Sequence, residues 1–144
     1  CLMGRLQSVL NVAARLVFSA WKYDHITPLL RELHWLSYPE RIAYRLAVLA
    51  FRCQHSSAPW YLSDELRASD VDSSRRLRSA STAVLVVPGS KHSTIGDRAF
   101  PVAAAKIWNT LPADVTSAPS LPSFKRKLKT ELFKRCYASD SANI

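Results

Sequence analysis

The sequence predicts a mainly α-helical protein with about five to six helices and one short strand or hairpin near residues 83–95. Three observations predict this class. The chain has 144 residues, of which 48% are hydrophobic, so it is long enough and apolar enough to bury a core. Apolar residues recur at helical spacing in several stretches. Only one stretch is short, rich in valine and ended by a Pro-Gly pair, as a strand is.

Two long helices are expected in the N-terminal half, residues 1–66. Residues 5–19 place a set of apolar side chains on one helical face. These are Leu6, Val9, Leu10, Ala13, Leu16 and Val17. Residues 40–55 are apolar over a much wider part of the helical circumference. We therefore expect this second helix to be central in the core.

Two shorter helices complete that half. Thr27 followed by Pro28 is a good N-cap and first-turn pair for a helix that runs towards Leu36. Pro59 ends the long central helix, and the apolar residues after it indicate another short helix near residues 60–66. Together the four helices make residues 1–66 one helical part of the chain.

A change of composition marks residues 67–82 as a flexible connection. The segment holds five serines, four arginines and two aspartates, with few large apolar residues. Residues 83–87 then form the valine-rich run that predicts a strand, and residues 91–95 would supply its partner in a hairpin.

The C-terminal half, residues 83–144, adds two helices. Apolar spacing predicts one helix after Gly96 that ends before Pro112. The last helix has an apolar stripe of Phe124, Leu128, Leu132 and Cys136. Its other faces carry many cations, so its surface is strongly basic.

Cysteine usage and hydropathy bear on the compartment. Cys1, Cys53 and Cys136 are an odd and scattered set, which favours free thiols in a reducing compartment over a disulfide framework. The longest apolar run, residues 46–51, is far shorter than the ~20 residues needed to cross a bilayer. We expect an intracellular protein, cytoplasmic or nuclear, that does not contact a membrane.

The residues needed for catalysis are not found in a recognisable arrangement. Three glycines are too few and too scattered for a phosphate-binding loop. Histidines and cysteines do not cluster as metal ligands, and no serine or cysteine has a base and an orienting carboxylate at a known spacing. The sequence therefore predicts no catalytic residue, no metal site and no cofactor.

The basic residues are the best functional signal. The formal net charge is +9, and two groups of cations are prominent. One group lies in the connection and one at the start of the last helix: Arg75, Arg76, Arg78, Lys125, Arg126, Lys127 and Lys129. Such residues neutralise phosphates, which predicts binding to the backbone of RNA or DNA. The tryptophans would add stacking on unpaired bases: Trp21, Trp35, Trp60 and Trp108. The alternative is that these charged residues only keep a helix surface hydrated and have no binding role, and that Trp35 and Trp108 lie in the core.

Several local runs, taken in order, resemble the C-terminal region of non-LTR retrotransposon reverse transcriptases of the Jockey type or chicken-repeat type. They include TPLLRELHWL at 27–36, GDRAF at 96–100 and WNTLP at 108–112. The remaining runs are residues 5–17, 23–26, 41–42, 46–49, 58–59, 61–62, 76–79, 120–121, 124–125 and 128–130. Together they cover nearly the whole chain.

The resemblance implies the end of the polymerase thumb and the tail after it, so that residues 1–66 would be thumb-like. It implies a non-catalytic fragment of an RNA-directed DNA polymerase, whose active site would lie in an upstream polymerase domain that is also its partner. Two alternatives stay open. The chain would be a structural interaction module that packs on that polymerase, or a functionless translated remnant of a retrotransposon.

Overall fold

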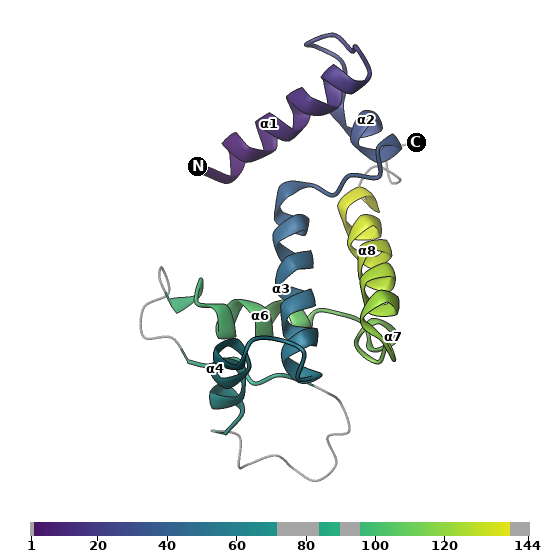
Figure 1. The fold of residues 1–144 in the computed structure, drawn as a ribbon. Coiled ribbons are helices and arrows are strands. Elements are labelled where there is room, and N and C mark those ends of the chain that lie inside the picture. Colours follow the sequence, from purple (N-terminus) through teal and green to yellow (C-terminus); the bar gives the residue numbers. More distant parts are fainter. Residues whose placement is uncertain (1, 72–83, 90–95, 139–144) are drawn as a thin grey trace. The chain divides into compact units, whose positions relative to one another are not determined.

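The computed structural model describes residues 2–71, 84–89 and 96–138, with the backbone alone for 67–71. These residues form seven helices and no strand (Figure 1). The helices are α1 (Leu2–Val17), α2 (Ile26–Glu32), α3 (Tyr38–Gln54), α4 (Trp60–Val71), α6 (Phe100–Asn109), α7 (Ala113–Thr116) and α8 (Leu121–Tyr137). The predicted mainly α-helical class is confirmed. The helix that the sequence did not predict is α7, whose four residues are too few to show an apolar period.

The start of α2 and the end of α4 are among the helix ends that differ from their predicted positions. The N-cap of α2 is His25, whose side chain makes no capping bond, so Thr27 and Pro28 already lie in the first turn. Proline fits there because the N–H groups of a first turn have no helical partner. α4 continues to Val71, five residues into the segment predicted as a connection, and residues 72–82 lie outside the described part.

The predicted strand is wrong for the part of residues 83–95 that the structure describes, because residues 84–89 have no regular structure. The side chain of Asn109 makes the hydrogen bonds to Leu85 that a neighbouring strand would make. The Asn109 amide donates from Nδ2 to the Leu85 carbonyl at 2.7 Å, and its Oδ1 accepts from the Leu85 N–H at 2.9 Å. One side chain thus satisfies both backbone groups of Leu85 without a ladder. The predicted partner at residues 91–95 lies outside the described residues.

The chain divides into two compact units. The first combines residues 1–44 with 128–144, and the second consists of residues 45–127. Each unit draws on residues from both sides of segment 67–82, and both α3 and α8 contribute residues to each unit.

The core of the first unit is built around Ala14, Leu30 and Tyr137. Partly buried apolar side chains pack against these three: Leu10, Ile26, Leu29, Leu33, Trp35, Phe133 and Cys136. The Tyr137 hydroxyl donates a hydrogen bond to the Trp35 carbonyl, which ties the end of α8 to the turn after α2. The amide of Gln7 accepts from the Tyr38 N–H at 2.8 Å and so links α1 to the start of α3.

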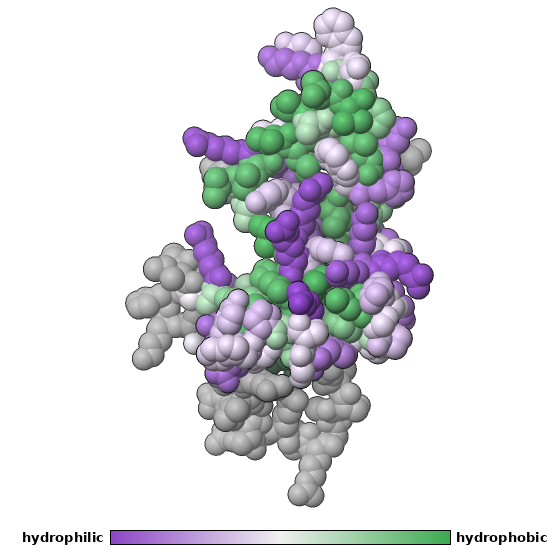
Figure 2. Space-filling view, in the orientation of Figure 1, coloured by the Kyte–Doolittle hydropathy of each residue, from purple (hydrophilic) through white to green (hydrophobic). Residues whose placement is uncertain are grey.

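The outward face of α1 is apolar. Of the stripe predicted from the sequence, Leu6, Leu10 and Ala13 are partly buried, whereas Val9, Leu16 and Val17 are exposed. Leu2 and Val12 are exposed as well, and Figure 2 shows apolar side chains gathered over this part of the chain. The stripe is wider than the surface that α2 offers, so only Ala14 of α1 is fully buried.

Aromatic rings form the core of the second unit. Phe124 of α8 stacks on Phe51 of α3 with ring centroids 4.4 Å apart, and on Trp108 of α6 at 5.7 Å. All three side chains are at most 2% exposed. α3 also buries Ala47, Ala50 and Cys53, in agreement with the expectation that this helix is central.

Candidate nucleic-acid interface

The cations of the last helix face outward because its apolar stripe faces inward. Phe124, Leu128 and Leu132 repeat at every fourth position of α8 and are 0%, 0% and 3% exposed. Ser120 precedes the helix, and its carbonyl accepts the Phe124 N–H at 2.8 Å to close the first turn. Between Leu121 and Tyr137 the sequence has six Lys and Arg residues and one acid, Glu131. α8 is therefore a strongly positive surface element.

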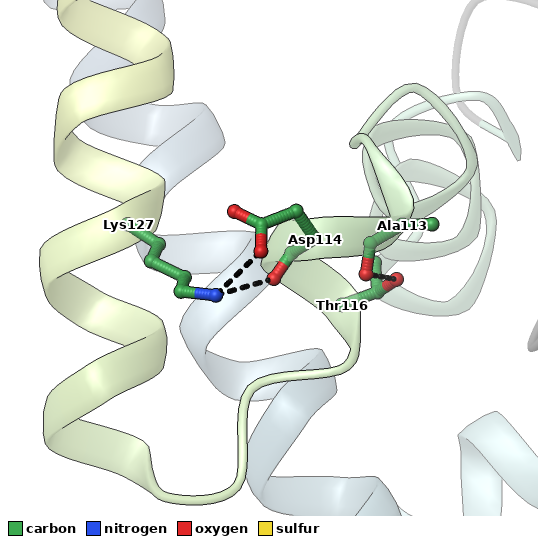
Figure 3. Close-up of polar contacts among 4 residues, drawn as sticks. All are labelled: Ala113, Asp114, Thr116 and Lys127. Atoms are coloured by element: carbon green, nitrogen blue, oxygen red, sulfur yellow. Dashed lines mark hydrogen bonds and ion pairs between the residues drawn. The ribbon is translucent and has the colours of Figure 1, made fainter.

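The structure separates the predicted α8 contacts into two kinds. Lys125, Arg126 and Lys129 are exposed. Lys127 is directed back to α7, with Nζ 2.6 Å from Asp114 Oδ1 and 3.1 Å from the Asp114 carbonyl oxygen (Figure 3). The Asp114 carboxylate neutralises much of this charge, so Lys127 has a packing role beside its predicted binding role. The predicted contacts Arg75, Arg76 and Arg78 lie outside the described residues.

The local field of α8 is favourable for anions. The first turn of the helix contains no acid, so its positive end is not compensated from within the helix. Glu131 lies further along, and its carboxylate is 3.0 Å from Nε of Arg135 in an i,i+4 ion pair. Lys125 and Lys129, one turn apart, have no ion-pair partner among the described residues.

A cavity of about 270 Å³ in the first unit includes one of the predicted residues. Its lining comes from the turn after α2, from α3 and from α8: His34, Trp35, Leu36, Arg41, Tyr44 and Lys129. Arg41 is fixed by a 3.0 Å bond from Nε to the Leu36 carbonyl, and its guanidinium lies 5.6 Å from the Trp35 ring centroid. Burial raises the pKa of the Tyr44 hydroxyl, so the phenol stays protonated at neutral pH.

Sequence reasoning did not select His34, Arg41 or Tyr44. The only local signal is that Arg41 and Tyr44 lie three positions apart, on one face of the helix that follows Trp35. Lys129 stands 85 positions after Tyr44 in the chain. No spacing rule connects residues so distant, and only the fold brings them together.

The four tryptophans differ in accessibility. Trp108 is 1% exposed and Trp35 is partly buried, as the alternative interpretation expected. Trp21 and Trp60 are each 80% exposed. Trp21 is followed by Lys22 and Tyr23, with the Lys22 ammonium 5.5 Å from the Tyr23 ring centroid. Exposed aromatic rings beside a cation are suited to stacking on unpaired bases.

The described residues form neither a metal-binding cluster nor a membrane-spanning helix. No group of three or more His, Cys, Asp or Glu side chains there is placed to hold a metal ion. No helix in the described ranges is both long enough and apolar enough to cross a membrane.

Comparisons of the chain with protein-family models, with curated proteins and with solved structures give no match. The class defined by the fold and by the surface is thus a mainly helical, strongly basic protein with an exposed cationic helix.

Proposed function

We propose that this chain is a non-catalytic accessory region of an RNA-directed DNA polymerase of the non-LTR retrotransposon kind, and that it binds the phosphate backbone of RNA or DNA. The observation that carries the binding role is the exposure of Lys125, Arg126 and Lys129 on a helix whose apolar residues Phe124, Leu128 and Leu132 are buried. The assignment to a polymerase rests on the ordered sequence resemblance described above. In this proposal the upstream polymerase domain is the partner, and the location is intracellular.

The salt dependence follows from the number of phosphate contacts. Each contact with a single strand contributes about 0.7 to the slope of log K against log salt, so three α8 contacts give a slope of about −2. Affinity then falls about twentyfold between 50 and 200 mM salt. Contacts from Arg75, Arg76 and Arg78 would steepen the slope further.

The test is fluorescence anisotropy of the full chain with a labelled 12-nucleotide oligouridine at 50 and 200 mM KCl. The variant Lys125→Gln with Arg126→Gln is expected to keep the fold and to reduce the slope to about −0.7. Its matched control is Arg45→Gln with Lys134→Gln, which removes one Arg and one Lys from exposed positions on α3 and α8. Equal losses in both double variants would mean that net charge, and not the start of α8, governs binding. No binding of the unaltered chain at 50 mM KCl would refute the proposal.

The exposed apolar face of α1 favours a second candidate function, an interaction module. Val9, Val12 and Leu16 are between 62% and 79% exposed. The first 23 residues contain Arg5, Arg15 and Lys22 but no acid. A second copy of the chain would bring like charges together, so the complementary partner is an apolar protein surface flanked by Asp and Glu.

A pair of designed helical peptides tests this candidate. Both have the same leucine stripe, flanked by glutamates in one peptide and by lysines in the other. We expect the Glu-flanked peptide alone to bind, and we expect Leu16→Glu to abolish that binding without changing thermal stability. Equal binding of both peptides would contradict the charge argument.

A further inference from the structure

We infer that the cavity lined by Arg41, Tyr44 and Lys129 binds one phosphate group of a single-stranded polynucleotide. This inference rests on the proposed function and deepens it, because it assigns one of the expected phosphate contacts to a built site. The first support is the charge of the side chains that line the cavity. None of the six lining residues is acidic, and two of them, Arg41 and Lys129, are cationic. An anion placed there meets no opposing carboxylate in the lining.

The second support is that donors in the lining are not otherwise occupied. Within the described part of the chain, Lys129 makes no hydrogen bond and no ion pair, and the Tyr44 hydroxyl makes no hydrogen bond. Arg41 uses Nε for the Leu36 carbonyl, which leaves its two terminal amino groups. An ammonium, a phenol and a guanidinium fork together match the several acceptor oxygens of a phosphate.

The third support is preorganisation. The Arg41 side chain is held on two sides, by the Leu36 carbonyl and by the ring of Trp35. Trp35 in turn is fixed through its carbonyl, which accepts a bond from the Tyr137 hydroxyl. Because the guanidinium is already ordered, binding costs little additional side-chain entropy.

His34 is the lining residue with an unusual backbone conformation. Its φ of 53° lies in the left-handed region, which is uncommon for a residue other than glycine. Its Nδ1 donates to the Glu32 carbonyl at 3.1 Å, and its ring stacks on Phe133 with centroids 5.7 Å apart. The His34 N–H donates to the Arg31 carbonyl at 3.0 Å and the Trp35 N–H to the Leu30 carbonyl at 2.9 Å, so the left-handed residue belongs to the C-terminal cap of α2. The cap fixes where the chain leaves α2 and so positions Trp35 and Leu36 in the lining.

The size of the cavity limits what it can take. Small-molecule sites usually occupy roughly 300 to 1,000 Å³, and about 270 Å³ lies just below that range. The space is suited to one phosphate with its sugar and not to an extended cofactor. The apolar side chains of Trp35 and Leu36 give the sugar an uncharged wall.

The experiment compares single variants of the full chain by anisotropy with the 12-nucleotide oligouridine. Lys129→Gln is expected to weaken binding about tenfold at 50 mM KCl and to lower the salt slope by about 0.7. Arg41→Lys keeps the charge but loses the fork, and we expect a similar loss of affinity. The matched control is Lys134→Gln, an exposed lysine of α8 outside the cavity lining, with an expected change of less than about twofold. Circular dichroism melting confirms that each variant is folded.

A second readout locates the anion directly. The Nε–H signal of Arg41 and the indole signal of Trp35 are followed by NMR during titrations with oligouridine, inorganic phosphate and hexaglutamate. Saturable shifts with oligouridine and with phosphate, absent in Lys129→Gln, support the site. Equal shifts with hexaglutamate would overturn the phosphate assignment in favour of a carboxylate.

The outcomes separate this inference from the proposed function. If the unaltered chain binds oligouridine but Lys129→Gln and Arg41→Lys behave as Lys134→Gln does, the cavity is not the site and the proposed function stands. If inorganic phosphate shifts the cavity signals while oligouridine does not bind, the polynucleotide is the wrong occupant and the proposed function fails as well.

Discussion

Replacing Phe124 by alanine is expected to remove a large part of the stability of the second unit. The Phe124 side chain is 0% exposed, and its ring stacks on both Phe51 and Trp108. Phe-to-Ala changes in cores cost about 3 to 5 kcal/mol, and the two ring contacts place this site in the upper half of that range. Whole domains are stable by only about 5 to 15 kcal/mol, so the variant is expected to be partly unfolded at 37 °C.

Urea unfolding followed by tryptophan fluorescence measures this loss. Trp108 is buried and reports on the second unit, whereas Trp21 and Trp60 are already exposed and change little. Trp35 is partly buried in the first unit, so the measurement is made with Trp35→Phe as the background. The control is Phe124→Leu, which loses the two ring contacts but keeps most of the apolar burial, so it is expected to cost clearly less than Phe124→Ala. A loss below about 1 kcal/mol for Phe124→Ala would refute the packing of α8 described above. Because Lys125 and Arg126 follow directly, oligouridine binding is expected to fall in parallel with the folded fraction.

Three further predictions follow from single contacts. Asn109→Ala removes both hydrogen bonds to Leu85 and is expected to lower the free energy of unfolding by about 1 to 2 kcal/mol. Asn109→Asp keeps the acceptor for the Leu85 N–H but sets a carboxylate oxygen against the Leu85 carbonyl, so it is expected to cost more than Asn109→Ala. Urea unfolding compares the two variants. Lys127→Gln breaks an exposed ion pair with Asp114 and is expected to cost less than about 1 kcal/mol. Of the four α8 residues predicted to contact phosphate, Lys127 is expected to have the smallest effect on the salt slope, and a change as large as that of Lys129→Gln would contradict this. Burial, with smaller contributions from Cys136 and Glu40, raises the pKa of Tyr137 to about 12. The protonated phenol therefore stabilises the folded chain fully below about pH 10, and this stabilisation is lost as the pH rises towards 12. In an alkaline titration of stability, Tyr137→Phe is expected to lack this loss.

Helix periodicity was sufficient to predict most of the fold. The apolar spacing of Phe124, Leu128 and Leu132 placed the last helix correctly and set its cations on the outside. The same reasoning did not identify which side of α1 is buried. A broad apolar stripe contains more residues than a neighbouring helix covers, and the sequence does not show which of them are covered. Val9 and Leu16 belong to the predicted stripe but are exposed.

Contacts distant in sequence account for what was missed. The valines near Leu85 have strand propensity, yet the backbone there is satisfied by the side chain of Asn109, 24 positions away. The cavity shows the same limitation. Lys129 was selected for its charge, whereas the aromatic and cationic residues around it come from the turn after α2 and from α3. Arg41 and Trp35 form no recognisable pattern in the sequence, and only the fold places α8 with Lys129 next to them.

The uneven exposure of the tryptophans gives the chain its own optical probes. Trp21 belongs to the first unit and Trp60 to the second, and each is 80% exposed. A collisional quencher such as iodide will reach both rings in the native protein, while Trp108 stays shielded. The less accessible rings are the ones that change on unfolding. A version of the chain that keeps only Trp35 therefore follows the first unit, and one that keeps only Trp108 follows the second, without an attached dye.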